Sequence, residues 1–186
     1  IMINSGFIPD APARIDACCE SYVRSVADAA RHIEARGFPL MIELEPGDSR
    51  VQSMQLLGPT DRVVELAERI RGRTGNHALA MDVAHIREEG ESVMDSLRAA
   101  KRWCNHIHLC NCVMDDPAHP LYGDKHVDFD CEGACFTYED FEHMYRQIRG
   151  MYEGEDLIVS LEITCREADN EAWFDRMAAR CGWLFE

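Results

Sequence analysis

The sequence predicts an α/β fold in which helices cover a parallel sheet. Five short apolar stretches alternate with longer stretches whose apolar residues recur every three to four positions. This alternation is typical of consecutive βα units. Four of the apolar stretches end on an acidic residue or a histidine. Because parallel α/β enzymes place their chemistry at the carboxyl ends of strands, the same pattern predicts a functional site.

Local sequence features separate the elements of the first half. Residues 13–36 are expected to form a helix because their apolar residues recur at helical spacing, and Gly37 is a favourable helix end. A Pro-Gly pair ends the strand at residues 40–45. Thr60 is a suitable N-cap for the next helix, which ends near Gly75. The predicted strands are residues 1–5, 40–45, 78–82, 106–110 and 157–163.

The second half contains the same alternation, interrupted by a long loop. Residues 92–103, 138–151 and 170–181 are predicted helices. The loop at residues 111–137 is rich in aspartate and also contains histidine. Because a loop longer than about 15 residues is usually functional or disordered, its composition favours a functional role.

The number of βα units predicts a particular architecture. A complete (β/α)8 TIM barrel typically needs about 250 residues, whereas this chain has 186. We therefore expect a single domain over residues 1–186 that contains about the last five βα units of a TIM barrel, with the first three units absent. An open five-stranded sheet is the alternative.

Composition narrows the function classes. The chain is 46% hydrophobic and has no stretch resembling a signal peptide or a membrane span. Its net charge of −15 makes a nucleic-acid partner unlikely, because such proteins usually present a basic face. The nine cysteines are odd in number, so reduced thiols and a cytoplasmic location are expected. Exposed sheet edges would make a homo-oligomer possible.

Four strand-end residues form a candidate metal site: Glu45, Asp82, His108 and Glu162. Three carboxylates and one imidazole suit one divalent cation such as Mn²⁺, Mg²⁺, Co²⁺ or Zn²⁺. Asp82 could instead be a helix N-cap or a turn former. Glu162 lies in an otherwise apolar strand, where a carboxylate has no inexpensive structural role.

Five segments together resemble one known family. They are LEPGDSR (44–50), AMDVAH (80–85), HIHLCN (106–111), GDKHVDF (123–129) and SLEI (160–163). Their order and spacing resemble the xylose-isomerase-like TIM-barrel superfamily. That superfamily includes sugar phosphate isomerases and epimerases, and also the AP endonuclease family 2 group.

The resemblance implies roles for these residues. Glu45, Asp82, His108 and Glu162 would bind one divalent metal, and the two glutamates would also act as the catalytic acid/base pair. The counterpart of His85 usually contacts substrate, or a second metal in the endonuclease branch. Asp124 and His126 form the DxH pair with which that branch binds an additional zinc, although the same residues could simply lock a loop.

Three more residues are candidate substrate ligands: Asn111, Lys125 and Arg166. The Asn111 amide could reach the substrate or a metal ligand, and the planar fork of Arg166 suits a phosphate or carboxylate. An ion pair of Arg166 with Glu167 or Asp169 is the alternative. Ketohexose epimerases hold substrate with an arginine after the histidine strand. The loop from 112 to 129 has Lys125 and no arginine, so the resemblance does not specify which sugar is the substrate.

These features predict a divalent-metal-dependent isomerase or epimerase. Its substrate would be a small-molecule sugar, a sugar phosphate or a related polyol ketone, and protons would be transferred through a metal-stabilised enediolate. Two alternatives remain. One is a metal-dependent phosphodiesterase resembling endonuclease IV, and the other is a non-catalytic sugar-binding barrel.

Overall fold

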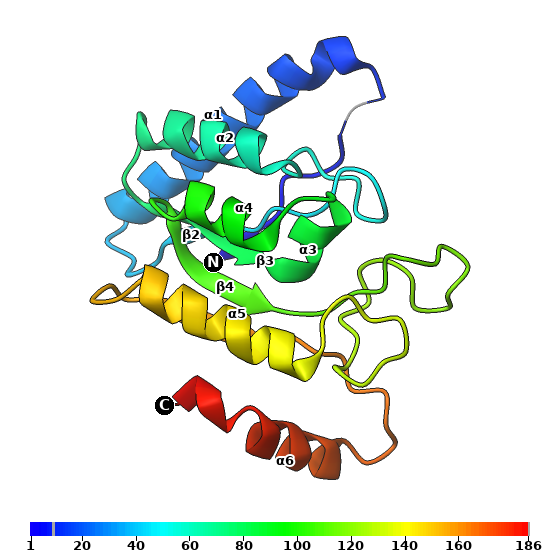
Figure 1. Ribbon diagram of the computed structural model, residues 1–186. Helices are drawn as coiled ribbons and strands as arrows, with labels where there is room; N and C mark the ends of the chain where they lie inside the picture. The colour runs from blue at the N-terminus through cyan, green and yellow to red at the C-terminus, as the bar shows by residue number, and fades with distance from the viewer. Residues whose placement is uncertain (9, 186) are drawn as a thin grey trace.

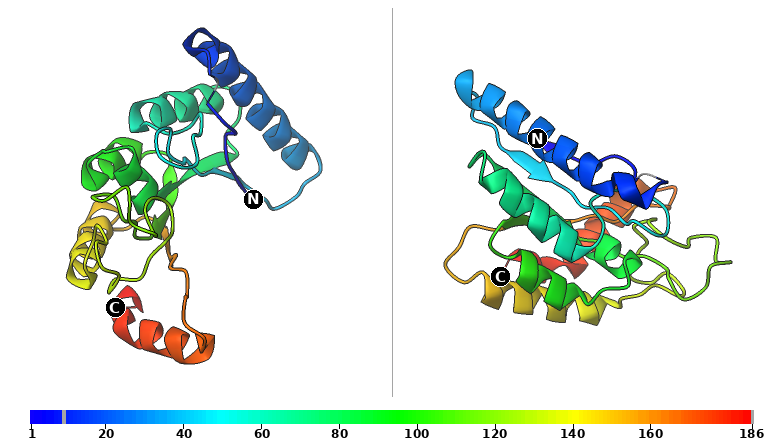
Figure 2. Two further views of the ribbon diagram at one scale, coloured as in Figure 1. Left: turned by 90° about the vertical axis from the view of Figure 1, so that its right-hand side faces the viewer. Right: turned by 90° about the horizontal axis from the view of Figure 1, so that it is seen from above.

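The fold is an arc of parallel strands with helices on its outer face (Figures 1 and 2). A computed structural model describes residues 1–8 and 10–185. Its five-stranded sheet has the order β1-β2-β3-β4-β5, and every neighbouring pair is parallel. The strands are Met2–Ile3, Ile42–Leu44, His77–Asp82, Cys104–Leu109 and Ile158–Leu161.

Six α-helices connect or follow these strands. They are α1 (Ile15–Ala35), α2 (Thr60–Arg71), α3 (Val83–Glu88), α4 (Val93–Ala100), α5 (Tyr138–Met151) and α6 (Asn170–Arg180), with short 3-10 turns at Pro12–Arg14 and Gly182–Phe185. The predicted α/β class and partial barrel are confirmed. Sequential strands are also neighbours in space, as the βα alternation requires.

The core lies between the sheet and the outer helices. Every residue of β3 is buried, and α1 and α2 each turn a stripe of apolar residues inward. Leu79, Leu66 and Ile107 are fully buried in this layer. Burial on both faces explains why β3 is an almost continuous apolar run that ends abruptly on Asp82.

One local expectation was wrong, and one helix was missed. Pro59, not Thr60, occupies the N-cap position of α2, and the Thr60 hydroxyl instead contacts the Glu91 carboxylate. The short helix α3 was not predicted, because six residues are too few to show a helical period. By contrast, α5 has the predicted bounds. Its start is fixed by a capping box between Thr137 and Asp140.

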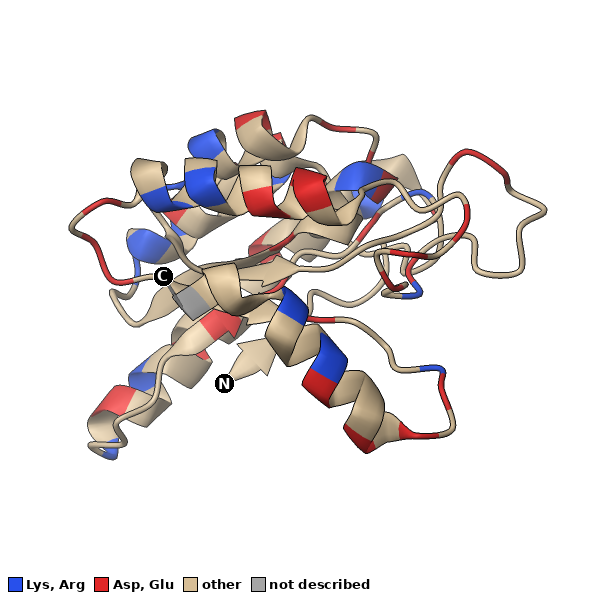
Figure 3. Ribbon diagram, turned by 60° about the horizontal axis from the view of Figure 1, so that its bottom comes forward, with Lys and Arg blue, Asp and Glu red and all other residues tan. Residues whose placement is uncertain are grey.

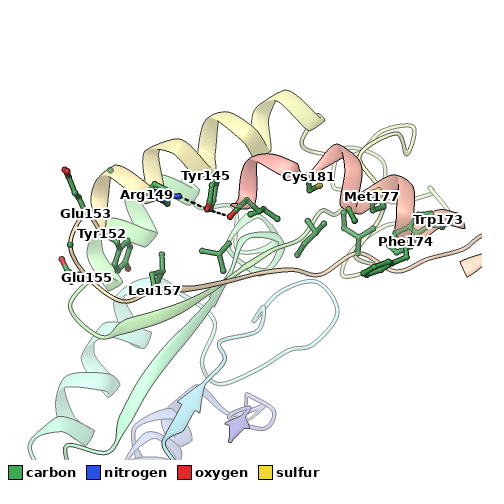
Figure 4. Close-up of a pocket in the computed structure, with 17 residues that line it drawn as sticks. Tyr145, Arg149, Tyr152, Glu153, Glu155, Leu157, Trp173, Phe174, Met177 and Cys181 are labelled. Carbon is green, nitrogen blue, oxygen red and sulfur yellow. Dashed lines mark hydrogen bonds between the residues drawn. The ribbon is translucent and has the colours of Figure 1, made fainter. Parts of the chain in front are cut away.

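The strand β5 lies at one edge of the described sheet and borders an apolar hollow. This hollow has a volume of about 1010 Å³ and lies between α5, β5 and α6 (Figure 4). Leu157, Trp173, Phe174 and Met177 are among its lining residues. None of the helices in the described residues has the length and apolarity needed to cross a membrane.

Candidate metal centre

Four residues converge at the carboxyl edge of the sheet. They are Glu45 just after β2, Asp82 at the end of β3, His108 in β4 and Glu162 just after β5. Asp82 and His108 are register partners, and the backbone N–H groups of both glutamates still donate to the neighbouring strand. Donor atoms of all four side chains lie within 4.8 Å of one another. The structure therefore brings together the four residues that the sequence singled out.

The His108 imidazole is surrounded by the three carboxylates. Its Nδ1 lies 3.0 Å from Glu45 Oε1, 3.3 Å from Glu162 Oε1 and 3.8 Å from Asp82 Oδ2. Ligand atoms that each lie about 2.0–2.2 Å from one ion are separated from each other by about 3.0–3.4 Å. Two of the three separations are already in that range, so the donors are nearly arranged for a cation.

The hydrogen bonds of the cluster are incomplete. Asp82 Oδ2 and both ring nitrogens of His108 are buried and have no hydrogen-bond partner. Buried polar atoms are normally satisfied, so such atoms call for an explanation. A divalent cation would satisfy Asp82 Oδ2 and His108 Nδ1 and would offset the charge of the crowded carboxylates. The residues present therefore fit a metal ion.

Charge coupling links the residues of the cluster. Burial alone would raise the pKa of Asp82, but the charges of His85 and His108 and a bond from the Cys110 thiol lower this pKa to about 2. Burial alone would lower the pKa of His108, but the carboxylates of Asp82, Glu45 and Glu162 raise it to about 10. A cation that binds His108 Nδ1 must therefore displace a proton.

Asp82 uses its two oxygens for different purposes. Its Oδ1 accepts from the backbone N–H of His85 (3.0 Å) and so caps α3, and it also accepts from the Cys110 thiol (2.7 Å). Its Oδ2 faces His108. The N-cap interpretation and a place in the metal cluster are thus compatible in one side chain.

A second group of donors adjoins the first. Asp82, His85 and His126 offer ligand atoms within 4.8 Å of one another. His85 Nδ1 lies 2.8 Å from the Pro46 carbonyl oxygen, which leaves Nε2 directed at Asp124 Oδ2, 3.3 Å away. Asp124 Oδ1 lies 2.9 Å from His126 Nε2. Asp124 therefore bridges the two imidazoles.

The backbone around His126 is strained. His126 has φ 44°, in the left-handed region that disfavours residues other than glycine. Such strain persists only where surrounding contacts fix it, and it is common at functional sites. Here the His126 carbonyl accepts from the backbone N–H of Thr164 (2.8 Å). The strained turn is thus tied to the segment after β5.

The three predicted substrate ligands occupy structural positions. The Lys125 ammonium donates to Gln52 Oε1 (2.5 Å). The Arg166 guanidinium donates to backbone carbonyls of Lys125, His126 and Thr164, and so forms neither predicted ion pair. Asn111 is fully buried and bonds the backbone of Phe136. Substrate binding by these residues stays a prediction, and each one positions the loop at 111–137.

Comparison with known proteins identifies the family. The family model described as xylose isomerase-like TIM barrel matches residues 2–184. The chain belongs to this family. No curated sequence matches it significantly.

Solved structures of the xylose isomerase-like fold resemble the chain at low identity. A 3-keto-D-glucoside 4-epimerase from E. coli is 14% identical with a TM-score of 0.64, and the match covers 98% of this chain and 63% of that one. D-Psicose 3-epimerase from Clostridium cellulolyticum is 16% identical with a TM-score of 0.61, covering 98% and 62%. An AP endonuclease of family 2 from Brucella melitensis is 17% identical with a TM-score of 0.58, covering 87% and 55%. The chain thus spans about three fifths of these structures.

Sequence reasoning missed one acidic residue beside this cluster. Glu88 in α3 is 3% exposed, and both carboxylate oxygens lack a hydrogen-bond partner. Burial, and then the charge of Asp124, raise the pKa of Glu88 to about 8. Nothing in the sequence distinguishes it from its neighbour Glu89, because only the course of α3 decides which of the two faces Asp124.

Proposed function

We propose that the chain forms the metal-binding part of a divalent-metal-dependent sugar isomerase or epimerase. The observation that carries this proposal is an asymmetry in the cluster. The side chains of Asp82 and His108 are 0% and 1% exposed, whereas those of Glu45 and Glu162 are 15% and 36% exposed. Two buried ligands would hold the ion, and two accessible glutamates could reach a substrate.

The two glutamates have different surroundings. Glu45 Oε2 accepts from the Asn4 amide at 3.3 Å, whereas Glu162 Oε2 lies 3.7 Å from His126 Nδ1. They follow β2 and β5, with the other two ligands on the strands between them. Carboxylates in unlike environments can take opposite acid/base roles. One glutamate would remove a proton from the carbon beside a ketone, and the other would return a proton.

A bound divalent cation would polarise the substrate carbonyl and stabilise the enediolate. Besides the two proton-transferring glutamates, the protein contributes orientation. His85 and His126 lie beside Asp82. His126 can bond a substrate hydroxyl, whereas His85, whose ring nitrogens face the Pro46 carbonyl and Asp124, would do so only in place of Asp124. The pKa of His85 is raised to about 10, because the charges of Asp82 and Asp124 override the effect of burial. The substrate would be a ketose, its phosphate or a related polyol ketone.

The variant Glu162→Gln tests the proton transfer. We expect it to slow exchange of substrate C–H with solvent deuterium by at least about 100-fold, because general acid/base groups typically contribute this much. Exchange would be followed by NMR on a panel of ketoses with each candidate metal. Glu132→Gln, on the exposed part of the long loop, is the matched control.

Metal content must be measured in the same samples, because Glu162 is also a proposed ligand. Mass spectrometry of the bound metal separates loss of the ion from loss of the base. Undiminished exchange in Glu162→Gln would contradict the proposed proton transfer. A wild-type chain that binds no divalent metal would favour a non-catalytic sugar-binding barrel.

One observation favours a second function, metal-dependent phosphodiester cleavage. Asp82, His85 and His126 could hold a further ion beside Asp124. Against it, acidic residues outnumber basic ones along the loop at 111–137, at the right of Figure 3. Such a loop would repel a phosphate backbone. About three zinc ions per chain with cleavage of an abasic oligonucleotide would support the nuclease, whereas one exchangeable ion would support the sugar enzyme.

A further inference from the structure

The long loop at 111–137 is closed by a narrow neck of paired backbone. Val113 and Ala134 form an antiparallel bridge, and the N–H of Cys135 donates to the carbonyl of Cys112 at 2.8 Å. Next to this pair, the Asn111 side chain bonds both the N–H and the carbonyl of Phe136, at 3.1 and 2.7 Å. The neck is therefore a fixed part of the fold.

Two cysteines face each other across this neck. Cys112 and Cys135 are directly opposite in the antiparallel pair, and their thiols are close enough for each to shift the pKa of the other. Opposite residues of antiparallel strands have Cα atoms about 4.5–5.5 Å apart. A disulfide spans about 4.4–6.8 Å between Cα atoms. The two sulfurs can therefore be joined without moving the backbone to a new register.

The two thiols differ in a way that assigns them different roles. Cys112 is fully buried, whereas Cys135 is half-buried. The adjacent Cys112 thiol and the nearby Arg87 guanidinium lower the pKa of Cys135, whereas the Cys135 thiol and burial raise the pKa of Cys112. A partly exposed thiolate beside a cation is the reactive form of cysteine, and an adjacent buried thiol can resolve its oxidised form.

We propose that Cys112 and Cys135 are a peroxide-sensitive thiol pair that closes into a disulfide across the neck of the loop. The Cys135 thiolate attacks hydrogen peroxide, and the O–O bond breaks to give a sulfenic acid and, after protonation, one water. The Cys112 sulfur then attacks the Cys135 sulfur and displaces a second water. Two thiols lose two electrons and two protons, and one peroxide is reduced to two waters.

The disulfide between Cys112 and Cys135 would affect the metal-ligand cluster through the loop at 111–137. Asp124 and His126 lie on the segment between the two cysteines, and Asp124 contacts His85. A covalent bond at the neck would limit the excursions of this segment from the cluster. Oxidation would thus restrain the part of the loop that borders the metal ligands. The proposed chemistry requires no substrate turnover and does not depend on the proposed enzyme function.

The test is peroxide titration of the metal-free chain, read by intact mass and by peptide mapping without reductant. The intact mass of the wild type should fall by the mass of two hydrogen atoms, and two titratable thiols should disappear. Peptide mapping should find the peptides that contain Cys112 and Cys135 joined by a disulfide. Cys135→Ser should slow this thiol loss at least tenfold. Cys112→Ser should leave a sulfenic acid at Cys135 that dimedone labels. Cys131→Ser, on the same loop, should behave as the wild type.

Arg87→Gln provides a milder variant that leaves both thiols in place. It should slow thiol loss severalfold, and Arg98→Gln on the exposed side of α4 should not. First oxidation at Cys131 or Cys165, with Cys112 and Cys135 still reduced, would overturn the proposal. Equal oxidation rates in Cys135→Ser and the wild type would do so as well.

Discussion

At the scale of single residues, Asp82 shows how one side chain can both stabilise a helix end and take part in the charged cluster. Asp82 caps α3 with one oxygen and faces His108 with the other. An asparagine could keep the cap, but it would remove the charge that couples Asp82 to His85 and His108. The need for two kinds of contact explains why a carboxylate follows the apolar residues 78–81 at the end of β3.

The raised pKa of Glu88 predicts that the stability of the fold depends on pH. Its pKa is raised to about 8 in the folded chain, against 4.5 for the free group. Between these values the unfolded chain releases a proton that the folded chain keeps. The free energy of unfolding should therefore fall as pH rises from about 4.5 to 8. Glu88→Gln should remove the contribution of Glu88 to this slope and stabilise the chain at pH 8 by roughly 2–4 kcal/mol, while the raised pKa values of His85 and His108 keep a smaller slope above about pH 6.5.

Urea unfolding at pH 5 and pH 8 checks the expected slope. Glu153→Gln, at an exposed position in the α5–β5 turn, serves as the control and should keep the slope of the wild type. If Glu88→Gln and the wild type lose stability equally between these pH values, the Glu88 carboxyl is ionised in the folded chain and the expectation is wrong.

At the scale of elements, the loop at 111–137 depends on Asn111. The amide makes bonds of 2.7 and 3.1 Å to Phe136 and one of 3.1 Å to the N–H of Cys112. Asn111→Ala should destabilise the chain by about 2–4 kcal/mol, because buried backbone groups would lose their partners. Thermal unfolding and limited proteolysis of the loop would measure this loss.

Asn105→Ala is the matched control for Asn111→Ala. The Asn105 amide donates only to the sulfur of Met41, at 3.5 Å, so its loss should cost less than about 1 kcal/mol. If Asn111→Ala keeps full stability but binds ligand more weakly, the predicted role of Asn111 in substrate binding would be favoured over its role in the loop.

At the scale of the whole molecule, the described sheet is open, and apolar surface lies beside its β5 edge. Phe174, at the hollow between α5 and α6, is 64% exposed. Unpaired edges and apolar hollows favour association. We expect concentration-dependent self-association of this chain, reduced by Phe174→Glu. Sedimentation velocity would measure it, and Phe38→Glu (51% exposed, on the β2 side) is the control. Equal association of both variants would exclude the hollow as the contact surface.

Much of the architecture could be predicted because its causes are local. Helical periodicity and a capping box define α5, and an apolar run that ends on Asp82 defines β3. The four cluster residues could be singled out because carboxylates and a histidine at the ends of apolar strands are otherwise costly. The bounds of β5 were less predictable. The strand ends at Leu161, so Glu162 lies just beyond it rather than within it.

The sequence by itself determined the order of the βα units and the chemical identity of the four cluster residues, since both follow from local patterns of apolar and polar residues. Only the tertiary structure decided the rest. It showed which glutamates are accessible, that Arg166 bonds backbone carbonyls, and that Glu88 and the pair Cys112 and Cys135 lie in unusual environments. The physical reason is that exposure, hydrogen bonding and pKa depend on neighbours that are distant in the chain, and only the packed fold brings them together.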